Sequence, residues 1–173
     1  MCLSASSYFG RLERTRRPCY ASHKGKGRIT TEGNIVQDLR ERARGALLTE
    51  ADDGIVSVYL FGSQASSRAH RESDIDLGVL LSWDTCRSSK DRFELRVTLS
   101  SQLTSALERP VDIVILNDAP PQLARRIIIT GERLLCIDAE VDHAFVRDTL
   151  IKAADIEPFL RRTRRIKLDA IMR

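Results

Sequence analysis

The sequence lacks the features that mark several common classes of protein. No apolar run approaches the roughly 20 residues that a helix needs to cross a bilayer, which argues against a membrane span. The four cysteines are scattered and form no C-x-x-C pair, which argues against a zinc site or a disulfide framework. This use of cysteine favours a reducing, cytoplasmic location. At 173 residues, with 42% hydrophobic and 30% charged positions, the chain suits one globular domain.

Most of the chain also lacks an excess of basic residues, since that excess is confined to the first 28 residues. Residues 1–28 contain seven Lys or Arg against the single acid Glu13, a net charge of +6, whereas the whole chain carries +4. The remainder is therefore −2, so the basic pI gives no reason to expect nucleic acid on the folded body. Residues 1–30 are predicted to be a disordered tail. The alternative interpretations are an arm that contacts a nucleic-acid backbone and an organelle transit peptide.

From about residue 30, the apolar pattern predicts alternating helices and strands, and hence an α/β (α+β) layered domain. Strands are expected at residues 55–61, 74–81, 111–116 and 134–137, and helices from Thr31 and at 88–108, 120–130 and 141–169. Asp118 is expected to cap the third helix and Gly131 to end it. Pro158 is expected to interrupt the last helix.

Three acidic residues lie on two of the predicted strands. Residues i and i+2 of a strand share a face, so Asp74 and Asp76 point to the same side while Ile75 points into the core. The strand 111–116 supplies a third acid, Asp112. If the two strands are neighbours, the carboxylates can converge on magnesium, which prefers oxygen ligands. Such a site can hold two ions that activate an attacking oxygen and stabilise a leaving phosphate.

A glycine and a serine end the strand that precedes these acids. Gly62 permits close approach of the backbone to a ligand. A helical turn starting at Ser63 would direct N–H groups at a phosphate. The pattern therefore predicts a triphosphate cradle beside the metal ligands, with ATP as the nucleotide.

These motifs resemble those of the polymerase-β-type nucleotidyltransferase superfamily, in particular its minimal nucleotidyltransferase (MNT) branch. The similar residues are Phe61-Gly62-Ser63, then ten residues, then Ser73-Asp74-Ile75-Asp76-Leu77, and later Val111-Asp112-Ile113-Val114. The resemblance covers roughly residues 32–140. It implies a polymerase-β-like fold with a small mixed sheet flanked by helices. The chain departs from the family at Ser66 and Ser67, where an arginine and a glycine are frequent. Arg68, or alternatively Arg71, is the candidate to supply the missing charge for the nucleotide.

The resemblance also implies an activity. It implies transfer of AMP from ATP to a hydroxyl, with Asp74, Asp76 and Asp112 as catalytic metal ligands for Mg²⁺ and Gly62, Ser63 and Arg68 as nucleotide-binding residues. Many MNT proteins are antitoxins that adenylylate a tyrosine of a HEPN-domain RNase toxin, so a HEPN toxin is the expected partner. The alternatives are a non-catalytic antitoxin that occludes its toxin, and transfer to a small molecule such as an aminoglycoside.

The last segment, residues 141–173, lies outside the resemblance. A run of four arginines surrounds Thr163 and follows a stripe of apolar residues that includes Phe145, Ile156 and Phe159. A solvated helix face is the simplest interpretation of the arginines. The apolar stripe suggests docking on a partner or on a second copy of the chain, so a homo-oligomer is an open alternative. The predicted organisation is thus a tail (1–30), a nucleotidyltransferase domain (31–140) and a helical docking segment (141–173).

Overall fold

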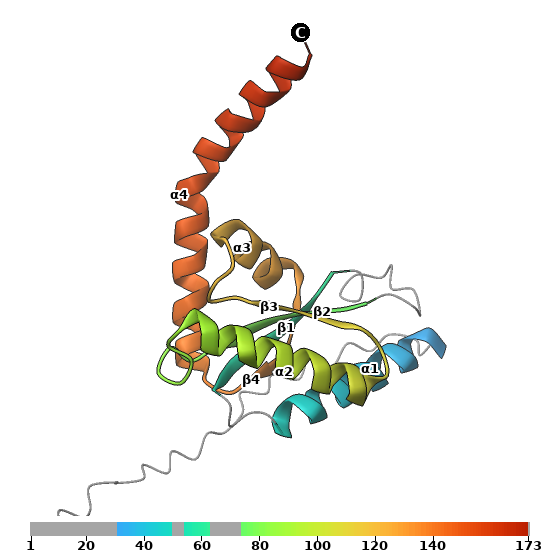
Figure 1. Cartoon of the computed structure of the whole chain (residues 1–173). Coiled ribbons are helices and arrows are strands. Elements are labelled where there is room, and N and C mark those ends of the chain that lie inside the picture. The colour runs from blue at the N-terminus through green and yellow to red at the C-terminus, as the bar shows by residue number, and fades with distance from the viewer. Residues whose placement is uncertain (1–30, 50–53, 63–73, 173) are drawn as a thin grey trace, which may run out of the picture.

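The computed structural model describes residues 31–49, 54–62 and 74–172. Within these ranges, the helices and strands follow the order that the apolar pattern predicts, and β1 and β2 follow each other without a helix in the described residues (Figure 1). The elements are α1 (Thr31–Thr49), β1 (Ile55–Phe61), β2 (Ile75–Leu81), α2 (Ser89–Leu107), β3 (Val111–Ile115), α3 (Pro121–Thr130), β4 (Glu132–Cys136) and α4 (Ala139–Ile171).

The four strands form one mixed sheet in the order β3-β2-β1-β4. β1 is antiparallel to both β2 and β4, whereas β2 and β3 are parallel and are joined through α2. The predicted small mixed sheet is therefore confirmed. β1 and β2 are central and almost wholly buried, which explains why their sequences are rich in β-branched and aliphatic residues.

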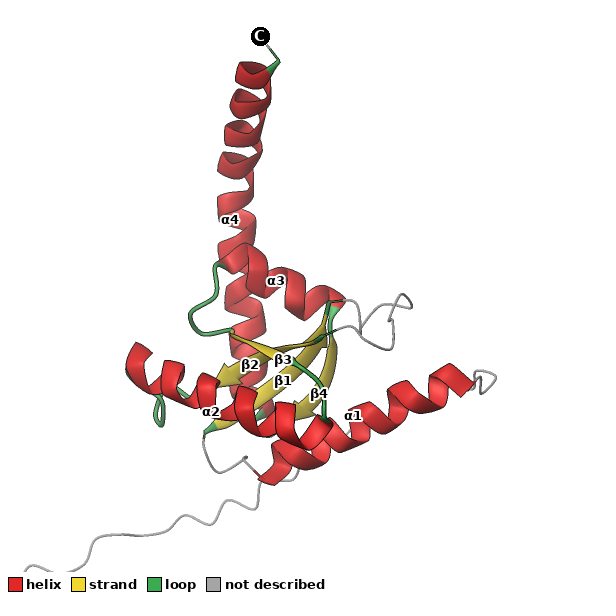
Figure 2. Cartoon of the chain, turned by 45° about the vertical axis from the view of Figure 1, so that its right-hand side comes forward, coloured by secondary structure: helices red, strands yellow, loops and turns green. Residues whose placement is uncertain are grey.

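Each face of the sheet is covered by a pair of helices (Figures 1 and 2). On one face, α1 and α2 pack through residues such as Leu47, Leu99 and Leu103. On the other face, α3 and the start of α4 pack through Ile127 and Phe145. Alternate residues of each strand enter the two cores, so the fold has two apolar layers, one on each side of the sheet.

A buried polar cluster attaches α4 to the sheet. Asp142 is fully buried and accepts hydrogen bonds from the hydroxyl of Ser57 at 2.5 Å and of Tyr59 at 2.8 Å. Arg133 of β4 completes the cluster with an ion pair to Asp142 at 2.8 Å. Burial, and then the neighbouring Asp142 carboxylate, raise the pKa of Tyr59 well above its ordinary value. The cluster therefore joins β1, β4 and α4 through one satisfied carboxylate.

Two local predictions are wrong. Asp118 does not cap α3, because its carboxylate is engaged by Arg92, and the helix instead begins after Pro120 without a side-chain cap. Pro158 does not interrupt the last helix, since α4 runs through it as one 33-residue helix. The Pro158 side chain is exposed, which limits the packing cost of a ring in a helix interior.

The remaining predictions of organisation concern the ends of the chain. Residues 1–30 lie outside the described residues, and the boundary predicted at residue 140 stays a prediction. Among the helices of the described ranges, none has both the length and the apolar character required for a membrane span.

Candidate active site

Two of the predicted acids lie side by side on neighbouring strands. In the parallel pairing of β2 with β3, Asp76 stands opposite Asp112, and Ile75 stands opposite Val111. Partners on adjacent strands are roughly 4.8 Å apart in the backbone and share a face of the sheet. Asp74 is exposed immediately before β2. The condition that the sequence left open, that the two acidic strands are neighbours, is thus met.

Gly62 closes the end of β1 directly against this carboxylate pair. Its neighbour Phe61 is the register partner of Asp76. Gly62 has φ = +73°, in the left-handed region that favours glycine. A Cβ atom at this position would overlap the Oδ2 atom of Asp76. The backbone therefore reaches the carboxylate only because residue 62 has no side chain.

The electrostatics of Asp76 show the effect of burial and of the two other acids on this carboxylate. Asp76 is half-buried, and desolvation is the largest cause that raises its pKa. The negative charges of Asp112 and then Asp74 raise it further. Like charges held this close disfavour the ionised state unless a cation is present. The site is therefore a concentration of negative charge with oxygen ligands, which is the chemistry that magnesium binds.

The site also has an arginine that the sequence pattern did not single out. Arg96 of α2 approaches Asp112 with 3.7 Å between its Nη2 atom and the Oδ1 atom. Both side chains are about half exposed, so this is a weak surface ion pair. The only sequence signal was the position of Arg96 in the helix that precedes β3. The separation along the chain gave no reason to choose it over Arg92, the other arginine of the same helix.

Other predicted site residues lie outside the described residues. Ser63 and Arg68 belong to residues 63–73, so the phosphate cradle stays a prediction beyond Gly62. Across the described side chains, no three residues of the His, Cys, Asp and Glu types are gathered into a ready-made metal cluster. The structure thus brings Asp76 and Asp112 together and leaves the participation of Asp74 to the proposal below.

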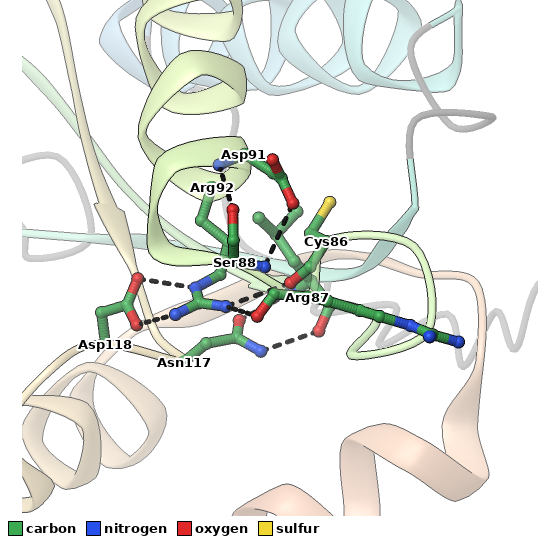
Figure 3. A network of polar contacts seen from close by, with 8 residues as sticks. Cys86, Arg87, Ser88, Asp91, Arg92, Asn117 and Asp118 are labelled. Atoms are coloured by element: carbon green, nitrogen blue, oxygen red, sulfur yellow. Dashed lines mark hydrogen bonds and ion pairs between the residues drawn. The ribbon is translucent and has the colours of Figure 1, made fainter.

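A different kind of charged cluster lies at the opposite end of β2 and β3 (Figure 3). The guanidinium of Arg92, which is buried, forms two hydrogen bonds with Asp118, at 2.8 and 2.6 Å. It also donates to the carbonyl groups of Cys86 and Arg87 and lies 5.0 Å from the ring centre of Trp83. This arginine fastens the loop after β2 to the loop after β3. The Trp83 ring is half-exposed beside this guanidinium.

The mixed sheet, the pairing of Asp76 with Asp112 and the left-handed Gly62 agree with the resemblance to nucleotidyltransferases that the sequence showed. The family model described as Polymerase beta, Nucleotidyltransferase matches residues 47–140. The chain therefore belongs to this family and is a nucleotidyltransferase.

A curated relative is the protein adenylyltransferase MntA of Shewanella oneidensis. It is 34% identical over 99 residues, which cover 57% of this chain and 67% of the relative.

Solved structures give the same fold. A crystal structure of a toxin–antitoxin with AMP-PNP is 27% identical, covers 78% of this chain and 98% of its own, and has a TM-score of 0.56. A complex of a tri-AMPylated HEPN toxin with an MNT antitoxin from Shewanella oneidensis is 24% identical, covers 78% and 99%, and has a TM-score of 0.52. At that identity, the second likeness shows the fold alone.

Proposed function

We propose that this chain transfers AMP from ATP to a tyrosine hydroxyl of a HEPN-type RNase toxin and thereby acts as its antitoxin. Two comparisons support this proposal. The curated relative is named a protein adenylyltransferase, and a similar solved structure is a toxin–antitoxin with an ATP analogue. The single observation that carries the proposal is the pairing of Asp76 with Asp112 next to Gly62.

The residues of the site fit magnesium by their chemistry. The pKa of Asp76 is raised by burial and by the neighbouring carboxylates, a repulsion that a divalent cation would relieve. Asp74, Asp76 and Asp112 would hold the ion, which supplies compensating charge for the phosphates when it is bound.

The exposure of the acids suggests separate roles. Asp76 is half-buried in a central strand, which suits a ligand held in a fixed position. Asp112 belongs to β3, an edge strand, and its side chain is 65% exposed. This exposure leaves Asp112 open to a hydroxyl carried by a second protein, and the role proposed for Asp112 is to accept a hydrogen bond from that hydroxyl and orient it.

The nucleotide is assigned to the same end of the sheet. The Gly62 turn opens the backbone toward Asp76, and Ser63 and Arg68 are the proposed contacts to the triphosphate. The location in the cytoplasm and the disordered tail stay predictions of the sequence.

The test is a transfer assay with the purified chain, magnesium, ATP labelled at the α-phosphate, and the product of an adjacent gene of HEPN type. Label is expected on the toxin with the wild-type chain and is expected to be lost with Asp74→Ala or Asp76→Ala. An aminoglycoside added in a parallel reaction tests the small-molecule alternative. If the Asp74→Ala/Asp76→Ala double variant neutralises the toxin as well as wild type does, catalysis is unnecessary and the chain acts by binding.

A further inference from the structure

The second half of α4 stands apart from the rest of the molecule. Figures 1 and 2 show it projecting from the sheet and from the other helices. In the described part of the chain, the buried side chains of α4 are Asp142, Thr149 and Ala153, all in the first half. We define the distal segment as residues 156–172. A single projecting helix gains no stability from tertiary packing, which is the main source of helix stability in proteins.

The packed face of α4 continues into the distal segment. Asp142 and Thr149 are seven residues apart and both buried. The next members of this seven-residue series are Ile156, Thr163 and Ala170, which therefore lie on the same face of the helix. Larger apolar side chains flank the series, and Phe159 and Ile166 are 68% and 62% exposed. The face that packs on the sheet in the first half thus extends, uncovered, along the second.

Thr163, the polar member of this face, is already satisfied. Its hydroxyl donates to the carbonyl oxygen of Phe159 at 3.0 Å. It can therefore be covered without leaving an unpaired polar group. Thr163 and Ala170 are small, whereas Phe159 and Ile166 are large. This alternation suits interdigitation with a second helical surface.

The distal segment as a whole is also basic. It has five Lys or Arg and two acids, a net charge of +3. One of the acids, Glu157, is engaged by Arg161 at 2.9 Å. That hydrogen bond is the largest cause that lowers the pKa of Glu157, and the charges of Arg161, Arg164 and Arg125 lower it further. Two distal segments that paired with each other would bring two such clusters together, which like-charge repulsion disfavours.

We propose that the distal segment is a docking helix for the partner protein and that it seats in an apolar groove with an acidic rim. The continuing apolar face suits an apolar groove. The basic residues of the segment suit negative charge around that groove. This inference rests on the proposed function, because the partner is the toxin proposed there as the acceptor of AMP.

The test measures affinity for the product of the adjacent HEPN-type gene by calorimetry, with the full chain. Ile166→Glu and Phe159→Glu are expected to weaken binding at least about tenfold, since each replaces a large apolar side chain of the exposed face with a charge. Leu168→Glu is the matched control. Leu168 is 59% exposed but lies two positions from Ile166, on the far side of the helix, so binding within about twofold of wild type is expected. Magnesium-dependent ATP binding by every variant verifies the fold.

Other outcomes would overturn the inference. Equal partner affinity of Ile166→Glu and wild type would do so, as would failure of the wild-type chain to bind the partner at all. A dimer of the chain alone, seen by light scattering and dispersed by Ile166→Glu with partner affinity unchanged, would assign the surface to a second copy. Binding to phosphatidylserine vesicles that Ile166→Glu removes, again with partner affinity unchanged, would assign it to a membrane. If the wild-type chain binds the partner but transfers no label to it, the proposed function is contradicted. The effect of Ile166→Glu on partner affinity then still decides this inference by itself.

Discussion

The two ends of the β2–β3 pair both carry carboxylates, but the carboxylates at the two ends have opposite surroundings. At one end, Asp118 receives two hydrogen bonds from Arg92, whose remaining donors reach the neighbouring carbonyl groups. At the other end, Asp76 stands opposite Asp112 on the neighbouring strand, and burial and then the charges of Asp112 and Asp74 raise its pKa. A satisfied carboxylate contributes to the fold, whereas clustered carboxylates cost stability and suit a bound cation. The first end is therefore structural and the second functional.

The largest expected effect comes from neutralising the functional end. Asp76→Asn should lower AMP transfer at least about a thousandfold, because a metal ligand contributes several kcal/mol to the transition state. The free energy of unfolding should stay the same or rise, since the raised pKa of Asp76 means that the fold disfavours its charge. A labelled transfer assay and urea denaturation measure the two quantities. A variant that is inactive because it unfolds would contradict this half of the comparison.

The structural end should respond in the reverse sense. Arg92→Ala leaves Asp118 and two carbonyl groups without their donor, and we expect a loss of roughly 2–3 kcal/mol in unfolding free energy, less than for a fully buried pair because Asp118 is part-exposed. Arg92→Lys should lose less, because it keeps the charge but not the paired geometry. Transfer activity per folded molecule should be unchanged. A selective fall in activity, with stability intact, would show that this end also serves the reaction.

Gly62→Ala should affect stability and activity together, because Gly62 joins the fold to the functional end. Left-handed backbone costs alanine about 1–2 kcal/mol, and its methyl would displace the Asp76 carboxylate. We therefore expect that loss of stability and at least a tenfold loss of transfer. Gly45→Ala is the matched control. A Cβ at Gly45 in α1 meets nothing within 4 Å, so this variant should be slightly more stable and fully active.

The smallest effect is expected at the capping box of α2, close to Arg92. Asp91 accepts a hydrogen bond from the backbone N–H of Ser88, while the Ser88 hydroxyl accepts one from Asp91. These bonds are the largest cause that holds the pKa of Asp91 below its ordinary 3.8. The charged carboxylate therefore stabilises the fold above that pH, and the contribution is lost as the pH falls through the lowered value. Asp91→Asn should be slightly less stable than wild type at neutral pH and equal to it in acid. A difference that is the same at both pH values would refute the assignment.

The sequence predicted most of the fold because its signals were local. The β-branched and aliphatic runs located β1, β2 and β3, and the Pro and Gly breaks located the ends of α2 and α3. The short β3 segment supplied Asp112, whereas the shared face expected for Asp74 and Asp76 stays a prediction, since β2 begins at Ile75. The sequence could not predict that β2 and β3 are neighbours and only assumed it. The pairing of Asp76 with Asp112 shows that they are.

The errors and omissions depend on partners that are distant along the chain. Asp118 suits a helix cap by local rules, but Arg92, 26 residues earlier, engages its carboxylate. The buried attachment of Asp142 to Ser57 and Tyr59 spans more than 80 residues and has no local pattern. Such contacts arise from packing, and a single sequence gives no means of choosing them.

The most direct test of the central claim is a manganese titration, followed by electron paramagnetic resonance, of the full chain with a non-hydrolysable ATP analogue. We predict that the wild-type chain binds the ion, and that Asp76→Asn and Asp112→Asn each weaken binding at least tenfold. Asp118→Asn, at the structural end, should bind as wild type does. Ion binding that is unaffected by Asp76→Asn and Asp112→Asn would contradict the account.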